Sequence, residues 1–193
     1  MTTIALASAS PRRRELLSQL GVDYQVVKID VDESQWPAES APAYVARLAK
    51  AKASAGFAAV AQQMPALGAD TIVVVDGQVL GKPKDQVDFM RMMQLLQGRS
   101  HQVMTAVAVV HAQGVEASTV TTDVWFGSLT EAAMMAYWQT GEPHDKAGGY
   151  GIQGIAGRFI EKINGSYFAV VGLPLFETSQ LLERVNKAGQ GVI

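Results

Sequence analysis

Three consecutive arginines near the N-terminus are placed where an anion could bind. The segment Ser8–Arg14 reads SASPRRR, with Ser10 as the expected N-cap of a helix and Pro11 at its first position. Arginines in a first turn oppose the helix dipole, whereas an anion at a helix N-terminus is favoured by the dipole and by free N–H groups. Helical spacing turns Arg13 toward the apolar stripe and sets Arg12 beside it. We expect both to bind phosphate; solvated surface arginines are the alternative.

Two more charged residues fall at positions where apolar side chains are expected. Lys52 lies on the same helical arc as Leu48 and Ala49, although lysines seldom face a core without a partner. Asp70 enters the apolar run Gly68–Val75, where a carboxylate usually has a cation or metal nearby. The alternatives are a lysine that extends along the helix edge to water and an aspartate that caps a strand or turn.

An acidic loop offers further oxygen ligands. Asp30, Asp32 and Glu33 follow an expected strand, and their carboxylates could share a hard cation such as Mg²⁺ with Asp70. A simply solvated loop is the alternative.

A glycine-rich segment, residues 145–154, reads DKAGGYGIQG and contains a literal GxGxxG. A dinucleotide site is excluded because no strand precedes the glycines and no acidic residue follows at the required distance within a βαβ unit. The glycines would instead let the backbone approach a ligand. The three histidines lack metal-ligand spacing and are interpreted as structural: His101, His111 and His144.

The composition excludes several classes of protein. Sixteen Lys and Arg against eighteen Asp and Glu give a net charge of -2, the wrong sign for a nucleic-acid or anionic-membrane binder. Cysteine is absent, which rules out disulfides, thiolate zinc sites and a cysteine nucleophile. The N-terminus lacks a signal-peptide pattern, and no run reaches about 18 apolar residues. We expect a cytoplasmic protein.

The elements that must position these residues alternate between short apolar runs and helical patterns, which predicts an α/β fold in one domain over residues 1–193. Strands are expected at 4–7, 24–29, 67–75, 78–80, 101–112, 115–126 and 158–163, and helices at 11–20, 41–60, 85–96, 130–139 and 174–186. Asp76-Gly77 is typical of a tight hairpin turn. An ideal hairpin would place Lys82 opposite Thr71, away from Asp70, unless Gly81 and Pro83 bend the register.

Four ordered motifs together resemble the Maf family, and the resemblance runs along almost the whole chain. They are SASPRR at 8–13, GADT at 68–71, GKP at 81–83 and DKAGGYGIQG at 145–154. The resemblance implies a single elongated α/β domain, with a mixed, twisted β-sheet flanked by helices and a cleft between two lobes, similar to the inosine triphosphatase group.

The implied activity is hydrolysis of the α-β phosphoanhydride of a nucleoside triphosphate with a divalent metal, Mg²⁺ or Mn²⁺. Phosphate charge would be neutralised by basic residues and the metal. The family pattern gives catalytic roles to Asp70, Lys52 and Lys82, substrate contacts to Ser8, Arg12, Arg13, Thr71 and Gln153, and metal binding to Glu33 and Asp70. Asp70 could act as general base toward water or as metal ligand, and both roles stay open.

Within the family, the branch that hydrolyses dTTP and UTP is the better match, because Thr71 and Gln153 differ from the branch acting on methylated guanosine triphosphate. An amide such as Gln153 can match both the carbonyl and the ring N–H of uracil or thymine. Three alternatives remain: hydrolysis of methylated guanosine triphosphate, hydrolysis of modified pyrimidine triphosphates, and regulation of septum formation through a partner surface. The family also implies a homodimer.

Overall fold

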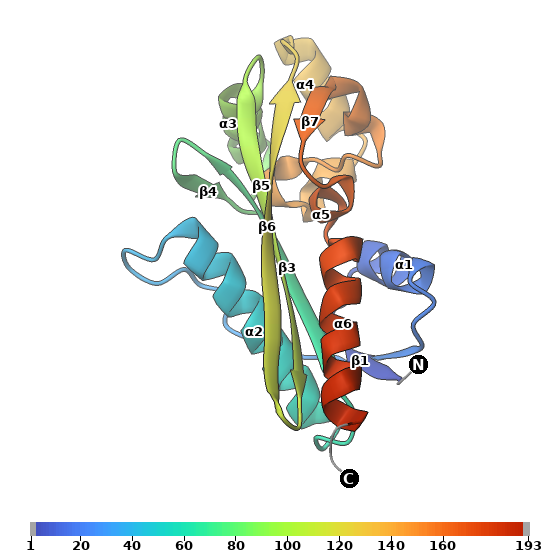
Figure 1. Ribbon diagram of the computed structural model, residues 1–193. Coiled ribbons are helices and arrows are strands. Elements are labelled where there is room, and N and C mark those ends of the chain that lie inside the picture. The colour runs from blue at the N-terminus through green and yellow to red at the C-terminus, as the bar shows by residue number, and fades with distance from the viewer. Residues whose placement is uncertain (1–2, 191–193) are drawn as a thin grey trace. The chain divides into compact units, whose positions relative to one another are not determined.

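The computed structural model describes residues 3–190 and has the α/β architecture that the alternating pattern predicts (Figure 1). The strands are β1 (Ile4–Leu6), β2 (Tyr24–Val26), β3 (Ala66–Val75), β4 (Gln78–Leu80), β5 (Ser100–His111), β6 (Gly114–Phe126) and β7 (Ile160–Asn164). The α-helices are α1 (Pro11–Gln19), α2 (Ala41–Ala59), α3 (Gln86–Leu96), α4 (Glu131–Trp138), α5 (Tyr167–Val171) and α6 (Leu175–Gln190). Three 3-10 helices complete the set: η1 (Glu142–Asp145), η2 (Ala147–Gly149) and η3 (Ile155–Phe159).

The sheet is mixed, as expected. Its strand order is β2-β1-β3-β5-β6-β7, with β4 paired to β3 outside this path. Parallel pairs join β1 to β2 and to β3, whereas β4 and β7 run antiparallel to their partners. Within residues 3–190, no helix has the length and apolar character needed to cross a membrane.

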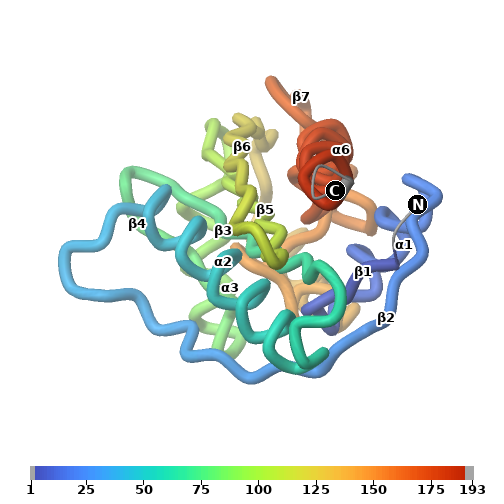
Figure 2. The backbone as a smooth tube through the Cα atoms, turned by 60° about the horizontal axis from the view of Figure 1, so that its bottom comes forward, coloured from blue at the N-terminus to red at the C-terminus, as the bar shows by residue number. Residues whose placement is uncertain are grey.

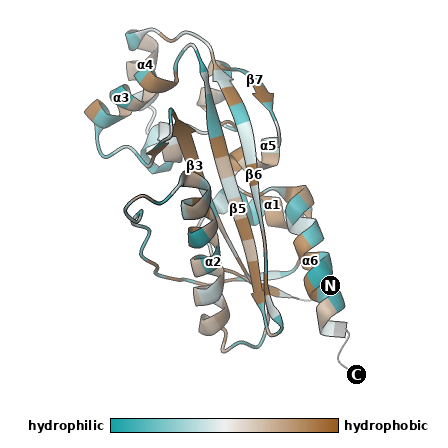
Figure 3. Cartoon of the chain, turned by 60° about the vertical axis from the view of Figure 1, so that its left-hand side comes forward, coloured by the Kyte–Doolittle hydropathy of each residue, from teal (hydrophilic) through white to brown (hydrophobic). Residues whose placement is uncertain are grey.

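The chain divides into two compact units, and three strands contribute to both. Unit 1 contains the chain up to Asp70, residues Thr105–Val120 and the chain from Gly172 onward, while unit 2 contains Thr71–Met104 and Thr121–Val171. Two of the shared strands, β3 and β5, have long apolar stretches, which are brown in Figure 3.

In unit 1, helix α2 packs against β3 at very close range. A Cβ on Gly68 would collide with the backbone of Ala49 and Ala53, so only glycine permits this approach of helix to strand. Side chains alternate along a strand, and Asp70, two residues after Gly68, therefore points to the same helix. On the other side of the strands lie α1 and α6 (Figures 1 and 2).

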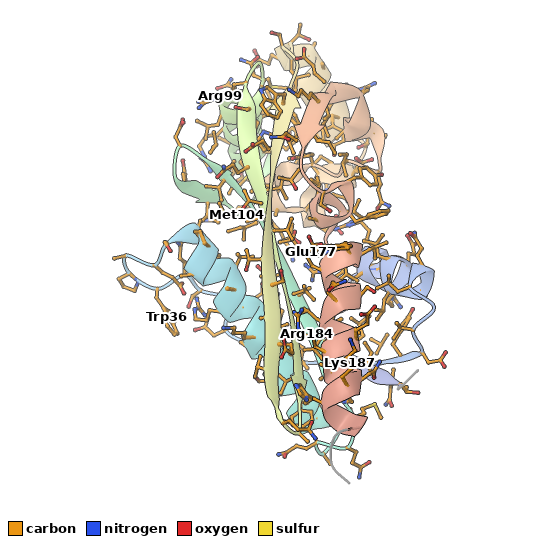
Figure 4. All side chains as sticks on the ribbon, in the orientation of Figure 1. Trp36, Arg99, Met104, Glu177, Arg184 and Lys187 are labelled. Carbon is orange, nitrogen blue, oxygen red and sulfur yellow. The ribbon has the colours of Figure 1, made fainter. Side chains whose placement is uncertain are left out.

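Helix α6 is tied to the sheet of unit 1 by one charged pair and an apolar face. Arg184, labelled in Figure 4, lies 2.8 Å from Glu116 on β6. On the inner face of α6, Leu181 is fully buried. The helix begins at Leu175, one residue after the expected start at Pro174, and extends beyond the expected end at residue 186.

Unit 2 is built around an aromatic and methionine-rich core. Its buried members include Phe89, Met93, Phe126, Tyr137 and Phe159, contributed by α3, α4, β6 and η3. Helices α3 and α4 begin one residue after the expected starts, because Asp85 and Thr130 act as caps. Asp85 accepts the Asp88 N–H at 2.8 Å, and Thr130 accepts the Ala133 N–H at 3.2 Å.

The hairpin β3–β4 forms as the Asp-Gly turn predicts. Asp76 and Gly77 have φ values of 49° and 75°, and Val75 pairs with Gln78. The same register extended would set Lys82 opposite Thr71, but β4 ends before Lys82 is reached.

Several expected boundaries were wrong for identifiable reasons. Strand β2 ends at Val26, three residues early, because its neighbour β1 is only three residues long. Helices α1 and α2 begin where expected, after Ser10 and Ser40, but neither serine side chain makes a capping hydrogen bond. The segment 158–163 becomes a strand only from Ile160, because η3 takes up Arg158 and Phe159.

Candidate active site

A buried ion pair in unit 1 joins the two charged residues singled out by their apolar surroundings. Lys52 Nζ lies 2.7 Å from Asp70 Oδ1, and each residue is 8% exposed. The same ammonium lies 2.7 Å from Glu33 Oε1, although the Glu33 side chain is 55% exposed. The geometry confirms that Lys52 faces inward, and it rules out the alternative in which its ammonium extends to water without a partner. Two carboxylates thus share one cationic group at the edge of the solvent.

The loop between β2 and α2, which carries Glu33, is fastened to α2 by side-chain contacts. Arg47 binds Glu39 through two contacts, at 2.6 and 2.8 Å, and donates to the Ser34 carbonyl at 2.9 Å. Its guanidinium lies 4.1 Å from the ring centroid of Trp36, which is labelled in Figure 4. We call Arg47, Glu39 and Trp36 the Arg47 clamp. Because the side chains of Arg47 and Glu39 are largely shielded from water, the clamp limits the movement of the loop.

One more bond acts on Glu33 itself. The Tyr44 hydroxyl donates to the Glu33 carbonyl at 2.7 Å, directly fixing the backbone of this residue. Among the loop acids expected to share a cation, Glu33 contacts Lys52. Asp32 instead accepts the Ser34 N–H at 2.9 Å. That backbone hydrogen bond lowers the pKa of Asp32.

The start of α1 presents a second group of polar side chains in unit 1. Arg13 donates to the Gly172 carbonyl at 2.8 Å and to Ser8 Oγ at 3.3 Å, and Ser8 is 7% exposed. Burial lowers the pKa of Arg13, while the charge of Asp70 acts in the opposite direction. Arg13 thus lies within electrostatic reach of Asp70, and Arg12 beside it is partly exposed.

Three candidate residues belong to unit 2. Thr71 follows Asp70 along β3 and is half-buried, whereas Lys82 and Gln153 are exposed. The Gly81 carbonyl accepts the Gly148 N–H at 2.9 Å, which brings the GKP motif next to the glycine-rich motif. The fold therefore joins two of the motifs that the sequence placed far apart.

The donor set in unit 1 suits a hard divalent cation. Among residues 3–190, no three His, Asp or Glu side chains gather into a metal-binding group. Mg²⁺, however, is usually held by one or two carboxylates, with water and substrate phosphates as its other ligands. Glu33 and Asp70 already direct one oxygen each toward a single cationic group, so the residues fit such an ion.

The histidines have structural surroundings, in agreement with the sequence interpretation. His101 Nε2 lies 2.6 Å from the Tyr150 hydroxyl inside unit 2, and His111 Nδ1 lies 2.9 Å from Gln113 Oε1. His144 packs against Trp138 with ring centroids 4.1 Å apart and ring planes tilted by 51°. The sequence reasoning missed Tyr44 and the Arg47 clamp; a tryptophan within an acidic loop, close to a helical Tyr and Arg, was the available signal.

Comparison with known proteins gives matches along almost the whole chain. The family model described as Maf-like protein matches residues 3–185. A dTTP/UTP pyrophosphatase of Pseudoalteromonas translucida is 54% identical over 93% of this chain and 95% of the relative. Proteins with the same name from Shigella sonnei and Vibrio vulnificus are 53% and 54% identical, over 96% and 94% of this chain and 94% and 98% of the relatives.

Two solved structures align with part of the chain at low identity. A nucleoside-triphosphatase (dITP/XTP pyrophosphatase) of Mycobacterium abscessus aligns with a TM-score of 0.44 and 16% identity, over 66% of this chain and 75% of that one. The Ham1 protein of Staphylococcus aureus aligns with a TM-score of 0.46 and 15% identity, over 64% and 71%.

Proposed function

Because this chain belongs to the Maf family, we propose that it hydrolyses the α-β phosphoanhydride of dTTP and UTP to the nucleoside monophosphate and pyrophosphate. Relatives named dTTP/UTP pyrophosphatase, 53–54% identical over more than nine tenths of the chain, support the substrate. The observation that carries the chemistry is the buried Lys52–Asp70 pair with Glu33 on the same ammonium.

Cleavage of this bond requires charge neutralisation on several phosphate oxygens. At the start of α1, Arg12, Arg13 and the Ser8 hydroxyl would bind phosphate, aided by the positive end of the helix dipole. Arg13 is already oriented by Gly172 and Ser8, so little freedom would be lost when it binds. The family pattern adds Lys82 as a further phosphate ligand.

Asp70 would act on the attacking water. Lys52 holds Asp70 by Oδ1, which fixes the carboxylate in one orientation for accepting a proton. Glu33 and Asp70 would hold Mg²⁺ or Mn²⁺, which, when bound, would lower the pKa of water and neutralise phosphate charge. Lys52 remains close enough to both carboxylates to stabilise charge that develops on a phosphate oxygen.

Selection of the base is proposed for Gln153, with Thr71 and Arg12 contributing. The amide of Gln153 is exposed and carries both an acceptor and donors, which the imide edge of uracil and thymine requires. A homodimer is part of the same family expectation, and light scattering of the purified protein would check it.

A nucleotide panel tests the proposal. Purified protein with Mg²⁺ or Mn²⁺ should release pyrophosphate from dTTP and UTP, with each other triphosphate, including methylated guanosine triphosphate and modified pyrimidines, hydrolysed more slowly. Asp70→Asn should reduce turnover at least about 100-fold, the lower range for general acid–base catalysis. Asp23→Asn, at an exposed aspartate, is the matched control and should keep wild-type activity.

Each other outcome has a defined meaning. No pyrophosphate from any triphosphate would overturn the enzymatic function and favour a regulatory protein. A preference for methylated guanosine triphosphate would contradict the pyrimidine assignment. Full activity of Asp70→Asn would remove Asp70 from the reaction.

A further inference from the structure

The loop that carries Gln153 rests on a partly buried carboxylate of unit 2. Glu142 accepts the Ile155 N–H at 2.8 Å through Oε2, and the Ala156 N–H at 3.3 Å through Oε1. These two amides begin η3, immediately after Gln153-Gly154, so Glu142 caps a helix that has no side-chain cap of its own. Burial would raise the pKa of Glu142, but these backbone bonds and a phenol lower it.

That phenol belongs to Tyr137, which is fully buried in the core of unit 2. Its hydroxyl donates to Glu142 Oε1 at 2.8 Å. The backbone N–H of Gly151, before Gln153, faces the same hydroxyl and partly offsets the rise in the Tyr137 pKa that burial causes. Tyr137 and Glu142 therefore fix the chain after Gln153 through hydrogen bonds, and Tyr137 contacts it before Gln153.

The glycines on each side of Gln153 lie close to the side chains of Glu142 and Lys146. A Cβ on Gly154 would collide with the Glu142 carboxylate, and a Cβ on Gly151 would lie 2.9 Å from the stem of Lys146. Lys146 is itself fixed by the Glu142 carbonyl and by Asp145, both at 2.7 Å. A side chain at 151 or 154 would therefore displace Lys146 or the Glu142 carboxylate from these contacts.

We propose that Tyr137 and Glu142 are positioning residues that set the base preference of the enzyme by holding Gln153 in one place. The proposal rests on the proposed function, in which Gln153 contacts the base. Hydrogen-bond discrimination between similar bases requires a donor and an acceptor fixed within a fraction of an ångström. The Gln153 side chain is exposed, so its position depends on the backbone at each side of it.

The test compares UTP with CTP, which differ at the edge that an amide would contact. Tyr137→Phe removes the bridging hydroxyl while keeping the ring, and Glu142→Gln replaces one acceptor by a donor. Each should lower the UTP-to-CTP ratio of kcat/KM about fivefold, the effect of one hydrogen bond. The change should appear in KM for UTP, with kcat and CTP hydrolysis unchanged.

A double-mutant comparison separates positioning from general damage. Gln153→Ala should lower the ratio by itself, and adding Tyr137→Phe to Gln153→Ala should change it less than about twofold, because coupled residues are not additive. Tyr24→Phe and Glu131→Gln, at sites outside this loop, are matched controls and should keep the wild-type ratio. A Tyr137→Phe effect that persists undiminished without Gln153 would overturn the proposal.

Hydrogen exchange tests the same contact without any substrate. The amides of residues 151–156 should exchange about fivefold faster in Tyr137→Phe than in the wild type, while those of β3 stay protected. Unchanged exchange in this loop would overturn the proposal whatever the activity. Absence of UTP hydrolysis by the wild type would instead contradict the proposed function, and exchange would still decide whether Tyr137 holds the loop.

Discussion

At the level of single residues, the Lys52–Asp70 pair combines catalytic potential with a structural cost. Both side chains are about nine tenths buried, and a buried charge that loses its partner is strongly destabilising. Lys52→Met should therefore lower the free energy of unfolding by about 3 kcal/mol and also abolish turnover. Chemical denaturation and a pyrophosphate-release assay measure the two effects.

Lys50 provides the matched control on the same helix. Its side chain is exposed, so Lys50→Met should leave stability within about 0.5 kcal/mol of the wild type and preserve activity. If Lys52→Met retained full turnover, Lys52 would have no place among the catalytic residues, whatever its effect on stability.

The sequence was sufficient to find these residues because a charge in an apolar pattern is visible without coordinates. Lys52 and Asp70 each interrupt a regular hydrophobic period, and the structure brings the two together. Tyr137 and Glu142 carried no such signal. A tyrosine in an apolar helix face and a glutamate beside a glycine are ordinary in sequence, and their function arises from hydrogen bonds to a distant backbone segment.

At the level of elements, the loop between β2 and α2 depends on the Arg47 clamp. Lysine keeps the charge of Arg47 but cannot form the two-pronged contact with Glu39 or stack on Trp36 as a planar group. Arg47→Lys should therefore increase hydrogen exchange of residues 33–39 about tenfold, which corresponds to the loss of one charge-assisted hydrogen bond. Mn²⁺ titration of the protein without nucleotide should show weaker binding, because Glu33 is less well held.

Arg91→Lys is the control for this substitution. Arg91 also binds one carboxylate, that of Asp88, through two nitrogens, but both residues lie on α3, away from residues 33–39 in the sequence. Its replacement should leave the exchange of residues 33–39 and Mn²⁺ binding unchanged. Equal protection of the loop in Arg47→Lys would show that Tyr44 alone holds it.

The elements that could be predicted are those with local sequence signals. Helix α3 has apolar periodicity, α3 and α4 both have capping side chains, and the Asp76-Gly77 turn has a specific backbone requirement, so all three are found where expected. Residues 141–159 are rich in glycine and have no period. Their three 3-10 helices are fixed by contacts with the rest of unit 2, such as the bond between Gly148 and Gly81.

At the level of the whole molecule, His101 makes the stability of the protein dependent on pH. Burial, with a smaller contribution from the charge of Arg99, lowers the pKa of His101 from 6.5 to about 4. The ring is packed against Phe126 and Tyr150 in the core of unit 2. A neutral imidazole is therefore favoured in the folded protein, whereas the unfolded chain takes up a proton below about pH 6.5.

The direction in which stability changes with pH follows from this difference in proton binding. Stability from His101 is complete above pH 6.5 and is lost as the pH falls toward 4, since only the unfolded state gains the proton in this interval. Between pH 7 and pH 5 the wild type should lose about 2 kcal/mol of unfolding free energy through this group, as urea denaturation at the two pH values would measure. His101→Phe, although less stable at pH 7 because Tyr150 loses its partner, should lose about 2 kcal/mol less over the same interval. His144→Gln, at an exposed histidine, should retain the wild-type dependence. An equal loss in wild type and His101→Phe would contradict the assignment and place the titrating group elsewhere.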